Sequence, residues 1–178
     1  KVIDVVAPGT GNAAEGRVFG GELELSALLS QDVSLLMTAG YLDTKYASFS
    51  DDFDPAQGID KGSRFVNSPQ WSLSSAVSYV IHGAKYGDVT LRGDWSYRSK
   101  VYNDAANSEF IAQGNLHLFN AGATFKKYGG KWQLALQVRN ITDETYVVTG
   151  NDEFSGFGYT ELVYARPREW SFTVKRIF

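Results

Sequence analysis

Long stretches of strict alternation between apolar and polar side chains constrain this chain more than any other feature of its sequence. The clearest stretch runs from Val89 to Val101, where alternate positions are apolar or small and four of the six positions between them are charged. A period of two places the two sets on opposite faces of a β-strand. That strand would be about 13 residues long, whereas strands in most soluble sheets have roughly 5–6 residues.

The same alternation divides most of the chain into strands. Eight strands are predicted: Lys1–Val6, Arg17–Leu29, Val33–Tyr41, Gln70–Ile81, Val89–Val101, Leu116–Phe125, Trp132–Asn140 and Glu169–Phe178. The composition agrees, because 4 Trp, 10 Tyr, 11 Phe and 18 Gly accompany only 4 Pro, which favours strands over helices. So many aromatic residues also exclude a disordered chain. The sequence therefore predicts an all-β fold.

The connections between these strands alternate in length. Three are short turns, at Ser30–Asp32, His82–Gly87 and Lys127–Gly130. Four are long loops, at Ala7–Gly16, Ser48–Ser68, Asn103–Asn115 and Val147–Arg168. Short turns on one side and long loops on the other are typical of a transmembrane antiparallel up-and-down β-barrel.

The aromatic residues indicate which face would meet lipid. Trp71 and Tyr79 share a face eight residues apart, and Trp170 and Phe178 repeat that spacing. Eight residues of a tilted strand span roughly 20 Å along a barrel axis, close to the ~25 Å apolar band between aromatic girdles. We therefore expect the apolar face to contact outer-membrane lipid and the polar face to line a hydrated lumen. A soluble binding barrel, the competing interpretation, would turn the apolar face inward.

Several classes of protein and site are disfavoured by the same sequence. There is no cysteine for a disulfide or a thiolate metal site. A net charge of −3 without a basic block argues against binding to nucleic acid. No apolar run is long enough for a transmembrane helix, and residues 1–10 lack the pattern of a signal peptide. The acidic loop at 50–60 could bind Ca²⁺ through its carboxylates, but it lacks the EF-hand spacing, so we expect a solvated surface loop and no metal site. We also expect no cofactor. We expect no catalytic residues, because nothing pairs a nucleophile with a base.

Several motifs resemble those of one family in order and spacing. The stretch from Lys131 to Tyr146, with Asn140, Asp143 and Tyr146, is similar to the "kW…l…v.NLtDk.Y" segment near the end of TonB-dependent outer-membrane receptors. The later Arg166-Pro167-Arg168 leads to a terminal Phe178, as it does in that family. Weaker likenesses cover 16–24, 65–69 and 89–104. Arg176 departs from the family pattern, which has an aromatic or apolar residue at the third position from the end.

The resemblance implies a particular role for the whole chain, 1–178. It would be the C-terminal portion of a barrel of about 22 strands, with the plug domain, the TonB box and the earlier strands absent from it. The family takes up scarce nutrients, most often ferric siderophores, across the bacterial outer membrane. Its energy comes from the TonB–ExbB–ExbD system acting on the plug, and the C-terminal strand is read by the barrel assembly machinery. A complete eight-stranded barrel, closed by pairing Val2–Val6 with Trp170–Phe178, is the alternative.

Charged residues on the predicted lumen face are the first candidates for contact with a substrate or a plug. They are Glu22, Glu24, Arg92, Asp94, Arg98, Lys100, Arg139 and Lys175. For an anionic metal chelate we favour the three arginines, because guanidinium pairs with carboxylate or catecholate oxygens and keeps its charge. The alternative is an ordinary hydrated wall whose charges pair across strands.

Aromatic residues in or beside the long loops are the second group of candidates. They are Tyr102, Phe110, Tyr146, Phe154, Phe157, Tyr159 and Tyr164. They could stack on a ligand that arrives from outside, pack the loops together or belong to a girdle. The two histidines have no second metal ligand at a suitable spacing; His82 is expected in a short turn and His117 on the lumen face.

Overall fold

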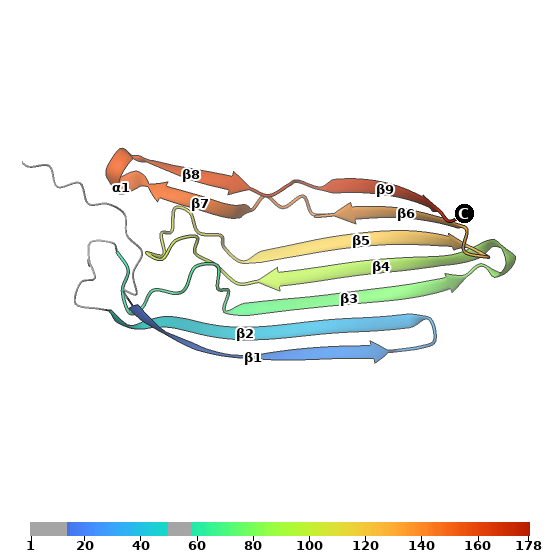
Figure 1. Ribbon diagram of the computed structural model, residues 1–178, viewed down its shortest axis with the longest axis horizontal. Coiled ribbons are helices and arrows are strands. Elements are labelled where there is room, and N and C mark those ends of the chain that lie inside the picture. The colour runs from blue at the N-terminus through green and yellow to red at the C-terminus, as the bar shows by residue number, and fades with distance from the viewer. Residues whose placement is uncertain (1–13, 50–57) are drawn as a thin grey trace, which may run out of the picture.

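The computed structural model describes residues 14–49 and 58–178, and its main feature is one antiparallel sheet of seven long strands (Figure 1). The strands are β1 (Ala14–Leu28), β2 (Val33–Phe49), β3 (Trp71–His82), β4 (Gly87–Arg98), β5 (Leu116–Lys127), β6 (Trp132–Arg139) and β9 (Glu169–Arg176). Each strand pairs with its neighbour in the order β1-β2-β3-β4-β5-β6-β9. The expected antiparallel up-and-down arrangement is confirmed. We call this sheet the wall.

The two ends of the wall differ as the loop lengths predict. The three short turns and the C-terminus lie at one end, which we call the short-turn end, and the long connections lie at the other, the long-loop end (Figure 1). The turn between β3 and β4 contains a short 3₁₀ segment, η2 (Ala84–Tyr86). Gly87 follows at φ +127°, where an added Cβ would lie 2.2 Å from the Lys126 carbonyl oxygen. This crowding requires glycine at that position.

The strand register gathers polar side chains on one face of the wall and apolar ones on the other. Cα partners in an antiparallel sheet share a face. One row joins Arg92, Gly122, Gln137 and Ser171, and the next joins Leu91, Ala123, Leu136 and Phe172. We call these two sides the polar face and the apolar face.

The apolar face of the wall is exposed. Leu23 is 69% exposed and Phe172 is 67% exposed. In the part of the chain that the structure describes, only Ala76, Val101, Ile111, Leu116 and Val147 are buried hydrophobic residues. A soluble sheet would cover its apolar face with a core, and the described strands contain no such layer.

The strand boundaries differ from the predicted ones at several places. The segment from Val147 to Arg168, expected as a loop, contains a second sheet made by β7 (Val147–Glu153) and β8 (Tyr159–Tyr164), joined by the four-residue helix α1 (Phe154–Phe157). β2 continues to Phe49, β4 ends at Arg98 and β9 ends at Arg176. The predicted strand Lys1–Val6 lies outside the described residues. Among the residues described, β1 and β9 form the edges of the wall, and no helix is long and apolar enough to cross a membrane.

A packed cluster of loops covers the long-loop end. We call the segments 58–70, 99–115 and 147–164 the loop cluster. Asn107 ties two of them, because the Arg64 amide donates to its Oδ1 at 2.6 Å and its Nδ2 donates to the Arg64 carbonyl at 2.9 Å. Ile111 is 0% exposed and lies against Gly150, where an added Cβ would meet the Ile111 Cβ at 2.9 Å. The hairpin of β7 and β8 can therefore approach the loop only because residue 150 has no side chain.

Candidate functional site

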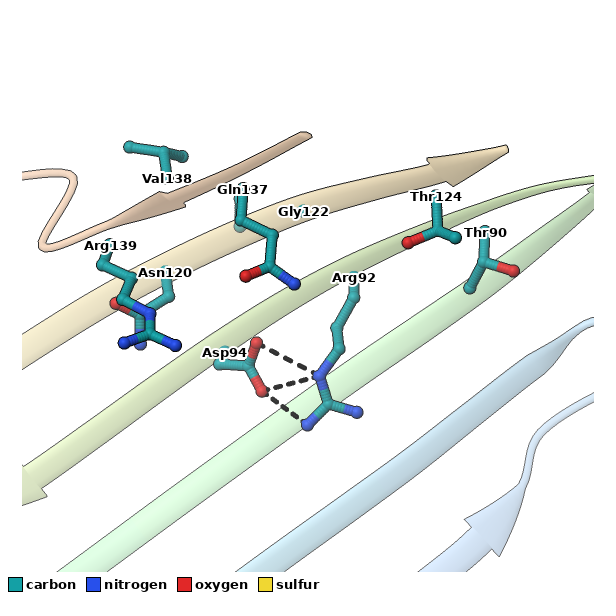
Figure 2. A pocket seen from close by; sticks show the side chains of 10 residues that line it. Thr90, Arg92, Asp94, Asn120, Gly122, Thr124, Gln137, Val138 and Arg139 are labelled. Atoms are coloured by element: carbon teal, nitrogen blue, oxygen red, sulfur yellow. Dashed lines mark hydrogen bonds and ion pairs between the residues drawn. The ribbon is translucent and has the colours of Figure 1, made fainter. Parts of the chain in front are cut away.

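An open hollow of about 560 Å³ lies on the polar face between β4, β5 and β6 (Figure 2). Polar side chains dominate its lining, which includes Arg92, Asp94, Asn120, Gln137 and Arg139. They come from three adjacent strands, because alternate residues of each strand point to the same face. Ligand sites of this size are common in proteins, so the hollow is the candidate site on the wall.

Arg92 is held by its neighbour on the same strand. Its Nε donates to the two Asp94 carboxylate oxygens at 2.9 and 3.2 Å, and its Nη2 donates to Oδ1 at 2.6 Å (Figure 2). Asp94 therefore fixes the guanidinium and neutralises its charge. An incoming anion would have to compete with this carboxylate.

Arg139 is the second cation of the hollow, and unlike Arg92 it is not paired with a carboxylate in the described residues. It stands beside Asn120, whose Oδ1 accepts the Asn140 amide at 3.0 Å (Figure 2). Glu169 is its partner across the strands, but the Glu169 carboxylate accepts from Arg166 at 3.2 Å. In the described ranges, 14–49 and 58–178, Arg139 has no ion pair.

The other predicted lumen residues divide between the polar face and the loops. Glu22 and Glu24 lie on the polar face opposite Gly40 and Thr38, and Lys175 lies there opposite Gln133. None of these three residues lines the hollow. The remaining two lie at the long-loop end of the wall: Arg98 is the last residue of β4, and Lys100 follows two residues later.

Arg98 points toward the loops rather than into the hollow. Its guanidinium carbon is 5.9 Å from the centre of the Tyr146 ring, and its Nε is buried without a hydrogen bond. The contact joins two residues of the family-like motifs. It serves to fix the connection after β6 against β4.

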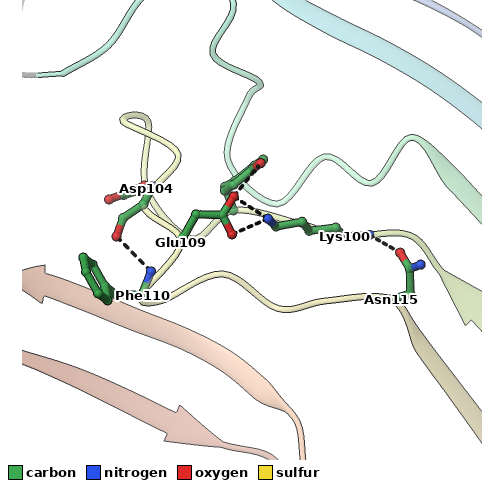
Figure 3. Close-up of polar contacts among 7 residues, drawn as sticks. Lys100, Asp104, Glu109, Phe110 and Asn115 are labelled. Atoms are coloured by element: carbon green, nitrogen blue, oxygen red, sulfur yellow. Dashed lines mark hydrogen bonds and ion pairs between the residues drawn. The ribbon is translucent and has the colours of Figure 1, made fainter.

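Lys100 lies beyond the end of β4, in the loop cluster, and pairs with Glu109. Its Nζ donates to both Glu109 carboxylate oxygens, and its amide donates to Asn115 Oδ1 at 3.0 Å (Figure 3). The Tyr102 hydroxyl also donates to Glu109 Oε1, at 3.3 Å. Donation from Lys100 lowers the pKa of Glu109, and the same bond raises the pKa of Lys100. Both residues stay charged across the neutral range, and the pair closes the 99–115 loop.

Two of the loop aromatic residues meet across different segments. The rings of Phe110 and Phe154 stack with centroids 5.3 Å apart. They border a second hollow of about 430 Å³ that also contains Asp104, Ser108 and Asp152. The Ser108 hydroxyl donates to Asp152, and its amide donates to Asp104 Oδ1 at 2.8 Å. The polar groups of this hollow are thus engaged with one another.

The remaining loop aromatic residues are dispersed. Phe157 and Tyr159 contact each other within the hairpin, with centroids 6.2 Å apart. Tyr102 lies under the Lys100 ammonium at 4.8 Å. Tyr164 is 55% exposed on β8. The structure therefore gathers one aromatic pair at a hollow and does not gather the whole predicted set.

Asn140 and Asp143 build the turn that ends β6. Both adopt left-handed backbone conformations, at φ +51° and +57°, which Asn and Asp tolerate better than most residues. The buried Asn140 side chain bonds the Glu144 amide and carbonyl, both at 2.9 Å. Asp143 Oδ1 accepts the Arg168 amide at 2.7 Å. The two family-like motifs therefore touch, and their role in this structure is to shape the chain.

The contacts of Arg176 explain how an arginine is accommodated where the family pattern has an aromatic or apolar residue. It lies on the apolar face opposite Trp132, with its guanidinium carbon 5.1 Å from that ring and 4.7 Å from the ring of Phe178. The stem of an arginine can cover apolar surface while its planar group stacks on aromatic rings. Phe178 itself lies beyond the end of β9.

His117 lies on the apolar face, so its predicted place on the lumen face is wrong. It pairs across the strands with Tyr97, and its Nδ1 accepts the Trp95 indole N–H at 3.3 Å. His117 and Phe119 are two residues apart on β5 and therefore share the apolar face. The polar face of β5 carries the even-numbered residues. With Tyr41 and Trp71, whose rings are 4.8 Å apart, these residues form an aromatic belt at the long-loop end.

Sequence reasoning missed part of the hollow and part of the loop network. Asn120, Gln137 and Thr124 line the hollow, and aligning the strands in register would have placed them beside Arg92. Glu109 has no such signal, because its pairing with Lys100 depends on the loop. Among the residues that the structure describes, no three His, Cys, Asp or Glu side chains gather as a metal site. Most of the acidic loop at 50–60 lies outside them.

One family model and several solved structures match this chain. The family model described as "TonB dependent receptor-like, beta-barrel" matches residues 2–141. Among solved structures, the ferric yersiniabactin uptake receptor FyuA from Yersinia pestis has a TM-score of 0.79 at 18% identity, over 94% of this chain and 24% of that one. The siderophore receptor PiuA and the ferric preacinetobactin receptor BauA, both from Acinetobacter baumannii, each have a TM-score of 0.69 at 20% identity, over 92% of this chain and 22% of theirs. At these identities the likeness concerns the fold, and the chain spans 24% or less of the receptors' lengths.

Proposed function

Because the chain belongs to the TonB-dependent receptor family, whose barrel model covers most of it, we propose that it forms the C-terminal part of a barrel wall through which an anionic metal chelate is taken up. Members of this family are receptors of the bacterial outer membrane that bind siderophores and interact with TonB; they are not enzymes. The whole receptor's activity is a proposal for this chain, which spans about a quarter of such a protein.

The observation that carries the proposal is the separation of the two faces of the wall. The apolar face presents exposed Leu23 and Phe172 and an aromatic belt that includes Trp71, which suits an outer-membrane position. The opposite face presents Arg92 and Arg139 at a hollow, which suits a hydrated lumen. Together these faces support a wall between lipid and water.

The substrate side of the proposal rests on the charge of that hollow. Arg139 is free of ion pairs in the described residues, while Arg92 is neutralised by Asp94. We infer that Arg139 makes the first contact with a carboxylate or catecholate of a ferric chelate, because a guanidinium can donate two parallel hydrogen bonds to such a group. The family likeness supports ferric siderophores as the substrate class.

The energy source and the assembly route complete the proposal. Transport would be driven by the TonB–ExbB–ExbD system through a plug domain encoded outside this chain. The barrel assembly machinery would engage the last strand, β9.

Uptake of radiolabelled ferric siderophores tests the proposal, in cells whose receptor is the whole natural protein that contains this sequence. We expect uptake that disappears when TonB is deleted. Arg139→Gln should raise the half-saturating concentration by about tenfold, as expected for the loss of one charge-assisted contact. Lys61→Gln, a charge-matched control in an exposed loop, should leave it unchanged. Uptake that persists without TonB would contradict the proposal.

A further inference from the structure

Two basic residues stand directly opposite each other on the apolar face. The register of β1 and β2 pairs Arg17 with Lys45, and the pairing continues through Phe19 and Asp43 to Gly21 and Tyr41. These pairs all lie on one face, since they are separated by two residues along each strand. Arg17 and Lys45 are therefore on the same side of the wall as Tyr41 of the aromatic belt.

The position of the pair along the wall corresponds to a membrane's headgroup layer. Lys45 is four residues beyond Tyr41, toward the long-loop end, which is about 10 Å along the axis of a barrel with tilted strands. Headgroup regions extend roughly 5–7 Å beyond each side of the hydrocarbon core. Long basic side chains can reach back over such a distance.

The charges of this pair are incompletely balanced. Like charges directly opposite each other destabilise a sheet. Lys45 Nζ lies 3.3 Å from Asp43 Oδ2, and this is the only ion pair of either basic residue in the described ranges. Both cations are exposed and only Lys45 has a carboxylate partner in the described ranges, so an additional anion would relieve the repulsion between them.

An apolar stripe continues along β1 from Arg17 toward the short-turn end, on the same face as the two cations. Phe19 and Leu23 lie two and six residues from Arg17 on the same face, and each is 69% exposed. A free anion would use the charges alone, whereas a lipid would use the charges and the stripe together. The arrangement therefore favours a lipid as the occupant.

We propose that Arg17 and Lys45 bind the phosphorylated headgroup of a lipid whose acyl chains cover Phe19 and Leu23. The Arg17 guanidinium can hold two phosphate oxygens in parallel, and the Lys45 ammonium adds a point charge. Asp43 competes with the phosphate for Lys45. The proposal rests on the membrane position proposed above.

The test uses the whole natural protein in detergent, titrated with diphosphorylated lipid A and followed by native mass spectrometry. The double variant Arg17→Gln/Lys45→Gln should bind the lipid about thirtyfold more weakly, or about fivefold for each basic side chain. The charge-matched control Lys61→Gln/Lys85→Gln should bind as the wild type does. Asp43→Asn should bind more tightly, a gain that misfolding could not produce.

Three results would overturn the lipid site. They are wild-type affinity in the double variant, equal affinity for lipid A stripped of its phosphates, and inorganic phosphate binding as tightly as the lipid. Membrane fractionation keeps this inference separate from the function proposed above. Recovery of the double variant in the outer membrane, with its lipid affinity lost, supports the site, whereas recovery of the wild type outside any membrane contradicts the membrane position itself.

Discussion

The wall and the loop cluster use apolar side chains in opposite ways. In the wall, Leu91 and Phe172 point outward and remain exposed, while the strands are held by their ladder of backbone hydrogen bonds. In the loop cluster, Ile111 is completely buried and Asn107 bonds a neighbouring segment. The loop cluster therefore has buried apolar side chains of its own, whereas the apolar side chains of the wall would be covered in the membrane position that we propose.

Truncating the buried side chain of the loop cluster should have the largest effect. We expect Ile111→Ala to destabilise the loop cluster by about 2–5 kcal/mol, because it leaves a cavity between the loop and Gly150. Leu91→Ala, on the apolar face, should cost less, since lipid can occupy the space that the side chain leaves. Amide hydrogen exchange of the whole receptor in lipid would measure both. Equal losses of protection in the two variants would remove the distinction between wall and loop cluster.

Placing a charge on each face of the wall tests whether the apolar face meets lipid and the polar face meets water. Ala123 and Thr124 are neighbours on β5, with Ala123 on the apolar face and Thr124 on the polar face. Ala123→Arg should destabilise the folded protein in the membrane by about 2–4 kcal/mol, as expected for a cation facing lipid near the midplane. Thr124→Arg should have little effect. Urea unfolding in lipid vesicles would compare them, and a larger loss for Thr124→Arg would mean that the faces are reversed.

The alternation of the sequence predicts the wall but cannot predict the loop cluster. A period of two determines which side of a strand each residue occupies, so the spacing of Arg92, Asp94 and Arg139 is enough to place them on a shared polar face. Alternation contains no information about loops. The hairpin of β7 and β8 depends on Gly150 lying over Ile111, a contact between residues far apart in the chain.

The candidate site is predictable to the same extent as the strands that form it. Spacing identifies Arg139 and Arg92 as cations of the lumen face, but their difference in availability depends on side-chain geometry. Asp94, two residues from Arg92, accepts hydrogen bonds from its guanidinium. Glu169 lies opposite Arg139, but its carboxylate accepts a hydrogen bond from Arg166 instead. Such preferences between possible ion pairs cannot be read from spacing alone.

The turn at Asn140 joins the two regions, and its substitution should have an intermediate effect. Asn140→Ala removes two side-chain hydrogen bonds to Glu144 and replaces asparagine, which tolerates a left-handed backbone conformation, by a residue that tolerates it less well. We expect a loss of about 2–3 kcal/mol. Asn140→Gly should cost about 1 kcal/mol less, because glycine accepts that conformation. Unfolding in urea measures both, and equal costs would show that the backbone conformation contributes nothing.

The smallest effect is expected at the exposed pair of Lys100 and Glu109 in the loop cluster. Donation from Lys100 lowers the pKa of Glu109 below its ordinary 4.5. The folded loop therefore gains stability above the ordinary pKa of the carboxyl and loses it as the pH falls through the lowered value. The raised pKa of Lys100 has the mirror effect, because its contribution is present at neutral pH and disappears only as the pH rises through the raised value. Solvent screens both groups, so the change in loop protection should be slight.

The pair of Lys100 and Glu109 lies in the loop cluster, whereas Arg92 and its partner Asp94 lie on β4 of the wall. In Lys100→Gln, the pKa of Glu109 should rise toward its ordinary value, while the loop around Ile111 stays folded, because the buried side chain and not the ion pair holds it. Carbon-13 NMR of labelled glutamate, with Lys61→Gln as the control, would follow the titration. An unchanged Glu109 titration in Lys100→Gln would show that another group sets its pKa. Collapse of loop protection in that variant would show that the loop cluster depends on surface charge rather than on its core.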